Sequence, residues 1–90
     1  MPYIKKDLRA KLDKSILDLI DALNTVDGQP DGMLNYIFTR LLAHTVIMPK
    51  SYANLERAIG VLECCKLELY RRAAAPYEDK KAVENGELSF

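Results

Sequence analysis

The stretch from Ser51 to Pro76, SYANLERAIGVLECCKLELYRRAAAP, constrains the fold more than any other part of the chain. Its apolar residues recur at steps of three and four, which is the spacing of one helix face and not of a strand. This row comprises Leu55, Ala58, Leu62, Cys65 and Leu69, and it ends at Arg72. Ser51 is a suitable N-cap, and Pro76 is expected to end the helix because its ring removes an amide hydrogen. The pattern therefore predicts one helix over about residues 51–75, roughly 35 Å long.

A second apolar stripe predicts a helix over about residues 14–25, with Asp13 as its N-cap. The stripe consists of Ile16, Leu17, Leu19, Ile20 and Leu23. Residues 1–12 also have apolar residues at helical spacing, interleaved with three lysines and one arginine. Their pattern fits either a continuation of this helix or a short turn before it, and their basic residues are expected to be solvated.

A third helix is predicted over residues 33–47, where the apolar positions again form one wide face. The segment VDGQPDG, residues 26–32, separates it from the preceding helix and consists of strong turn formers. After Pro76 we expect a short helical turn that ends near Asn85 and Gly86. The predicted fold is all-α: a small bundle or hairpin built on the long helix, in a single domain over residues 1–90.

Composition excludes several classes of function. The formal net charge is +0, so no global field favours DNA or RNA. No apolar run approaches the roughly 20 residues that span a bilayer, and the charged N-terminus MPYIKKDLRAKLD does not resemble a signal peptide. We therefore expect no membrane and no nucleic-acid partner, and a cytoplasmic location.

Residues that could support catalysis or metal binding are sparse. Cys64 and Cys65 are adjacent, so they cannot readily bridge to each other, and we expect both to be small buried helix residues. His44 is the single histidine and has no acidic partner at matching spacing. The glutamates of the long helix lack the paired spacing of magnesium-binding helical pyrophosphatases, and Glu63 is expected to pair with Lys66 instead. We predict no catalytic residue, metal or cofactor, and no enzyme activity.

The best candidate binding cluster lies at the end of the long helix: Tyr70, Arg71 and Arg72, with Tyr77 following. Guanidinium groups bind phosphate through two donors, and tyrosine rings stack on bases. Asn35 and Arg40 are candidates for reading the edge of a base. The competing interpretation is a charge-paired helix end, in which Glu68 pairs with Arg72 and the arginines interact with the helix dipole.

Apolar residues on more than one face of the long helix indicate self-association. Val61, Cys64 and Leu67 lie away from the main apolar row, so a second surface of the helix requires cover. Two shorter helices cannot bury so much of a long one. We predict a homo-oligomer, in its simplest form a dimer through the long helix.

Two segments resemble a known group of proteins. LNYIFTRLL and GVLECCKLELYRRAAAPYEDKK are similar to a family of short uncharacterised proteins of bacteriophages and bacteria, over roughly residues 33–87. The architecture is also similar to phage sponge proteins that counter the CBASS and Thoeris defences, small helical oligomers that sequester cyclic nucleotides. That similarity implies an anionic nucleotide ligand for this chain. The alternative function is a helical protein–protein interaction module without a small-molecule ligand, and a helical nucleotide pyrophosphatase is a third.

Overall fold

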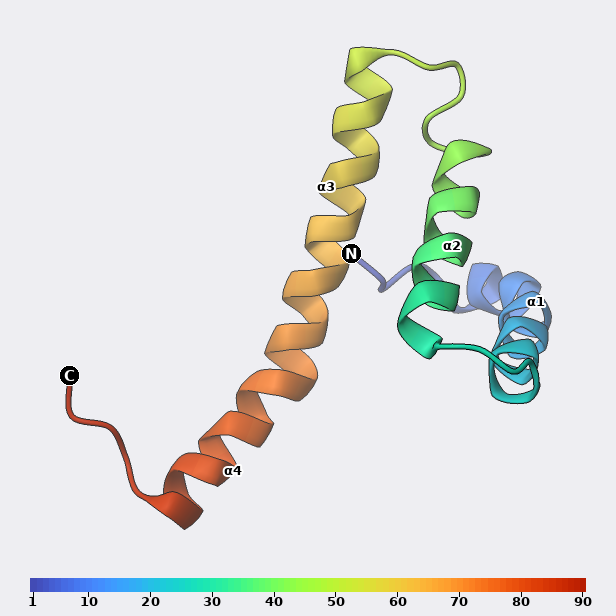
Figure 1. Cartoon of the computed structure of the whole chain (residues 1–90). Helices are drawn as coiled ribbons and strands as arrows, with labels where there is room; N and C mark the ends of the chain where they lie inside the picture. The colour runs from blue at the N-terminus through green and yellow to red at the C-terminus, as the bar shows by residue number, and fades with distance from the viewer. The chain divides into compact units, whose positions relative to one another are not determined.

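The computed structural model describes all residues, 1–90, and consists of helices without strands (Figure 1). The predicted all-α class is confirmed. The elements are α1 (Lys6–Thr25), α2 (Pro30–Ala43), α3 (Tyr52–Leu69), the π-helical turn η1 (Tyr70–Ala74) and α4 (Ala75–Asn85).

The chain divides into two compact units, which are described one at a time. Residues 2–58 form one unit, containing α1, α2 and the first turns of α3. Residues 59–90, together with Met1, form the other, containing the rest of α3, η1 and α4. The single domain expected from the length of the chain stays a prediction.

Helix α1 begins at Lys6 and not at residue 14, so the assignment of Asp13 as an N-cap is wrong. Lys5 is the N-cap, and Asp7 in the first turn interacts favourably with the helix dipole. The apolar row that starts at Leu8 and Leu12 continues without a phase change into the following stripe, which explains the single helix. With 20 residues, α1 and not α3, which has 18, is the longest helix.

Helix α2 begins at Pro30, three residues earlier than predicted, and ends at Ala43, four residues earlier. Pro30 occupies the first turn, where its missing amide hydrogen costs nothing, and Asp31 follows at the positive end of the dipole. The turn formers of residues 30–32 therefore start a helix instead of ending a loop. Residues 44–47 form a turn, in which the amide of Ile47 donates to the carbonyl of Leu42 at 3.1 Å.

The start of α3 agrees with the prediction. The backbone amide of Asn54 donates to the Oγ of Ser51 at 3.1 Å, which is the hydrogen bond of an N-cap. The side-chain amide of Asn54 donates to the carbonyl of Pro49 at 2.7 Å and ties the preceding segment to the first turn. Ser51 thus caps α3, as the sequence indicates.

Pro76 does not end the helix, contrary to the prediction. In Figure 1 the ribbon runs from α3 through η1 into α4 without a break. In η1 the amide of Ala75 donates to the carbonyl of Tyr70, five residues earlier. This hydrogen bond spans one residue more than the bond of an α-helix, so the turn contains an extra residue. Pro76 then occupies the first turn of α4, where a proline is tolerated. Helix α4 ends before Gly86, whose φ of 96° is the positive value that favours glycine.

Very little of the chain is buried. Ala58, with 3% of its surface exposed, is the one buried residue, and the apolar residues around it are at best half-buried. Cys64 and Cys65 are both exposed, so the expectation that they are buried is wrong for the single chain.

We expect the substitution Ser51→Ala to lower the free energy of unfolding by about 1 kcal/mol, because the amide of Asn54 loses its acceptor. Ser51→Asp should retain most of the stability, since aspartate also caps helices. Urea denaturation followed by circular dichroism measures both. Equal stability of the alanine variant and the parent would contradict the assigned cap.

Candidate functional site

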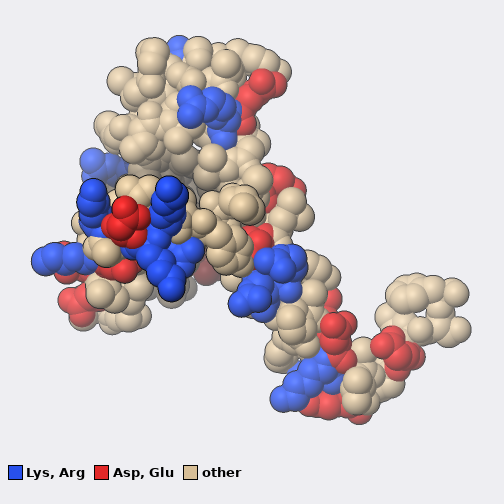
Figure 2. Space-filling view, turned by 180° about the vertical axis from the view of Figure 1, so that it is seen from behind, with Lys and Arg blue, Asp and Glu red and all other residues tan.

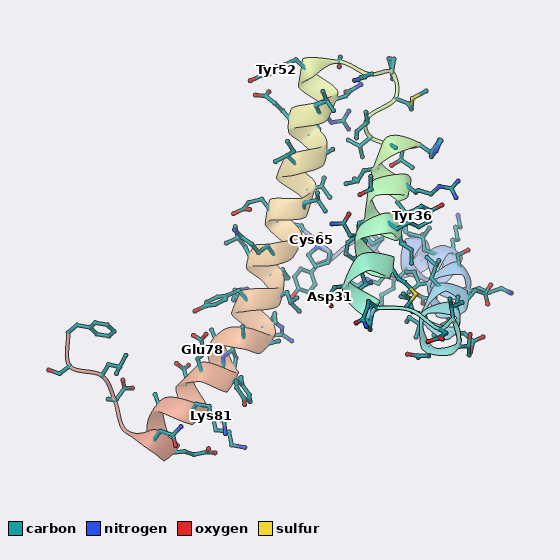
Figure 3. All side chains as sticks on the ribbon, in the orientation of Figure 1. Asp31, Tyr36, Tyr52, Cys65, Glu78 and Lys81 are labelled. Atoms are coloured by element: carbon teal, nitrogen blue, oxygen red, sulfur yellow. The ribbon has the colours of Figure 1, made fainter.

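Tyr70 and Glu78 form a hydrogen bond across the π-helical turn. The hydroxyl of Tyr70 donates to Oε2 of Glu78, eight residues later, at 2.9 Å. Glu78 lies in the first turn of α4 (Figure 3). The hydrogen bond to the Glu78 carboxylate, together with its negative charge, raises the pKa of Tyr70 above its ordinary value of 10.0. The contact joins the first residue of η1 to the first turn of α4.

Arg71 and Arg72 have different surroundings. Nη2 of Arg71 lies 2.7 Å from Oε1 of Glu68, three residues earlier. The predicted pair of Glu68 with Arg72 is therefore wrong: side chains three and four residues away are both neighbours on a helix, and the nearer arginine occupies the carboxylate. Arg72 has neither a hydrogen bond nor an ion pair in the structure. It is the one arginine of the predicted cluster with a guanidinium that no carboxylate neutralises.

Tyr77 is exposed on α4, and its ring lies beneath a cation. Nζ of Lys81, one turn further along α4, is 5.6 Å from the centre of the ring. Lys81 also forms an ion pair with Glu84 at 3.2 Å. One face of the Tyr77 ring is therefore already in a cation–π contact within the chain.

The cluster at the end of α3 has mixed charge. Carboxylates of Glu68 and Glu78 bind Arg71 and Tyr70 directly, and Asp79 also contributes to the raised pKa of Tyr70. On the face shown in Figure 2, lysines and arginines are likewise interspersed with aspartates and glutamates. A phosphate approaching this cluster meets carboxylates as well as guanidinium groups.

Arg40 and Asn35 lie on α2, in the unit formed by residues 2–58, and not in the unit that contains Tyr70. Nη1 of Arg40 donates to the hydroxyl of Tyr36 at 3.3 Å, and its guanidinium lies 5.7 Å from the centre of that ring. Oδ1 of Asn35 accepts the hydroxyl of Thr39 at 3.3 Å. Four of the six predicted site residues are thus brought together on one helical segment, and two are not.

Sequence reasoning missed an apolar groove along α1 and α2. It consists of two adjoining hollows of about 360 and 400 Å³, which share Tyr36 and Ile37. The other lining residues are Ala22, Leu23, Val26, Gly32 and Met33 in the first hollow, and Leu19, Arg40, Leu41, His44 and Thr45 in the second. The helical spacing of Met33, Tyr36 and Arg40 indicates this face of α2, of which Arg40 alone was predicted as a site residue.

The remaining chemical features are few. Glu63 and Lys66 form the predicted ion pair, with 3.0 Å between Oε1 and Nζ. No three side chains of His, Cys, Asp or Glu gather where a metal ion could bind. None of the helices combines the length and the apolar character needed to cross a membrane.

Comparison with models of known protein families gives a match over almost the whole chain. The family model described as a domain of unknown function, DUF6899, matches residues 1–88. No curated protein and no solved structure matches the chain.

We expect Glu78→Gln to lower the pKa of Tyr70 towards its ordinary value, because the variant removes the charge that opposes ionisation of the phenol. A raised folded-state pKa means that the hydrogen bond stabilises the fold below the ordinary pKa, and that this contribution is lost as pH rises through the folded-state value. Titration of the tyrosine ring carbons by NMR measures the shift, with Tyr70→Phe for assignment. Glu84→Gln, which removes a carboxylate paired to Lys81, is the control and should leave Tyr70 unchanged. An unchanged pKa in Glu78→Gln would refute the assignment.

Proposed function

We propose that this chain, which belongs to the DUF6899 family of domains of unknown function, is a non-catalytic helical protein-binding module that works as a homo-oligomer. The family itself supplies no activity. We place it in the cytoplasm of a bacterial host, as the resemblance to phage proteins suggests. The observation that carries the proposal is the near absence of burial in the single chain.

The helices carry apolar rows that nothing in the chain buries. On α1, Leu8, Leu12 and Ile16 expose 46%, 51% and 48% of their surface. On α3, Ile59 and Leu69 expose 67% and 68%. A short helix without tertiary packing is marginal in water, and contiguous apolar surface of this kind is typical of a protein interface. Association of identical chains buries such rows against each other, and stable homodimers bury about 2,000–5,000 Å² or more in total.

The chemistry of the Tyr70–Tyr77 segment also favours a protein partner. Tyr70 and Arg71 already bind carboxylates, which compete with a phosphate for the same donors. Tyrosine and arginine are enriched among the residues that dominate binding energy at protein interfaces. Mixed charge and exposed aromatic rings suit such an interface better than they suit an anion.

We expect the purified protein to sediment as an oligomer at micromolar concentration, with a thermal unfolding midpoint that rises with protein concentration, because assembly stabilises the folded state by mass action. Analytical ultracentrifugation and calorimetry over a hundredfold range of concentration test this. A monomer with a concentration-independent midpoint would overturn the proposal.

A second candidate function is sequestration of an anionic cyclic nucleotide, an anti-defence role of the kind performed by phage sponge proteins. The unpaired guanidinium of Arg72 is the observation that favours it, since it leaves two donor edges for a phosphate. Tyr77 would stack on a base beside it.

For this second function, we expect native mass spectrometry with a panel of cyclic and linear nucleotides to detect an oligomer that gains the mass of one intact nucleotide. Arg72→Ala should weaken that binding by about tenfold or more, because a charge-assisted phosphate contact contributes about 1.5–3 kcal/mol. Arg57→Ala, at an exposed arginine near the start of α3, is the matched control. Spectra without any bound nucleotide would contradict this second function and leave protein binding as the remaining candidate.

A further inference from the structure

One apolar row of α3 passes from a covered to an uncovered part of the helix. Leu55 is half-buried and Ala58 is buried, both within the unit of residues 2–58. Leu62 and Leu69 continue the same row into the unit of residues 59–90, and they expose 42% and 68% of their surface. Cys65, between them, is exposed as well. The row keeps its helical spacing from its covered into its uncovered part.

We propose that this exposed row, Leu62, Cys65 and Leu69, packs against the same row of a second copy of the chain. The proposal rests on the homo-oligomer of the proposed function and assigns the surface that forms it. The residues are spaced by three and four, which is the spacing of the apolar positions that form helix–helix seams.

The row suits a copy of itself better than another partner. Leu62, Cys65 and Leu69 carry no charge, and Arg72, where the longer row ends, lies beyond them, so a two-fold contact centred on Cys65 brings no like charges of these residues together. Large and small side chains alternate along it, and a leucine of one copy therefore fits opposite the smaller thiol side chain of the other. The formal net charge of +0 adds no long-range repulsion between copies.

The opposite face of α3 provides an internal comparison. Each residue turns an α-helix by about 100°, so Cys64 points about 100° away from Cys65, and Leu67 about 160° away from Leu69. Cys64 and Leu67 are both exposed in the single chain, as are Cys65 and Leu69. Exposure in the chain therefore does not distinguish the two faces, whereas burial in the proposed contact does.

Thiol labelling of two single-cysteine variants tests the proposal. In Cys64→Ser the remaining Cys65 is expected to react about tenfold or more slowly than the remaining Cys64 in Cys65→Ser, at concentrations where each variant is an oligomer. In urea the two rates should become equal. Equal rates in a variant pair that ultracentrifugation shows to be oligomeric would overturn the proposed surface and leave the homo-oligomer intact, whereas monomeric chains would overturn both.

A pair of leucine substitutions provides an independent test. Leu69→Lys places a charge in the row and is expected to give a monomer, while Leu67→Lys places the same charge on the opposite face and should leave the oligomer unchanged. Circular dichroism reports whether each variant remains helical. If Leu69→Lys loses its helices, the thiol-labelling rates of the two single-cysteine variants test the proposed surface instead. A Leu69→Lys variant that assembles as the parent does would contradict the proposal.

Discussion

Cover for apolar helix faces is the constraint on which the rest of this structure depends. Helical hydrogen bonds alone leave a short helix marginal in water, and burial of a leucine side chain adds about 1.5–3 kcal/mol. The chain provides that burial only near Ala58, where the start of α3 packs within the unit of residues 2–58. Elsewhere the apolar rows of α1 and α3 lie open, as does the groove along α1 and α2. The proposed assembly follows from this deficit more directly than from any single polar residue.

The spacing of apolar residues was sufficient to predict an all-helical chain and the approximate position of three helices. The helix boundaries were less predictable because proline can either interrupt a helix or occupy its first turn. Pro30 starts α2, where its missing amide is not needed, and Pro76 lies in a helix that continues past it. The sequence pattern around each proline is that of a strong turn. Ser51 was simpler to interpret, since its hydroxyl has one favourable role at that position.

The candidate site was predictable as a cluster and not as a set of contacts. Tyr70, Arg71, Arg72 and Tyr77 do lie on one helical segment. The partner of Tyr70 is Glu78, eight residues later. The two side chains meet two turns apart because the helix continues past Pro76 and η1 adds one residue to it. A helix that stopped at Pro76, as predicted, would exclude this contact. The choice between Arg71 and Arg72 as the partner of Glu68 depends on rotamers that spacing does not encode. Exposure of the two cysteines was not predictable, because the helical spacing does not tell whether residues of the same chain or of another chain pack against them.

The π-helical turn also rotates the side chains of α4 about the helix axis relative to those of α3. Five residues occupy the length that an α-helix assigns to four, so side chains beyond residue 74 are rotated by about 100° relative to an uninterrupted α-helix. The stripe that ends at Leu69 therefore does not continue along α4, and the two halves of the rod face different directions. Loss of one residue from η1 would restore a single phase and align α4 with the α3 row. The extra residue of this turn thus lets one continuous helical segment present two separate faces.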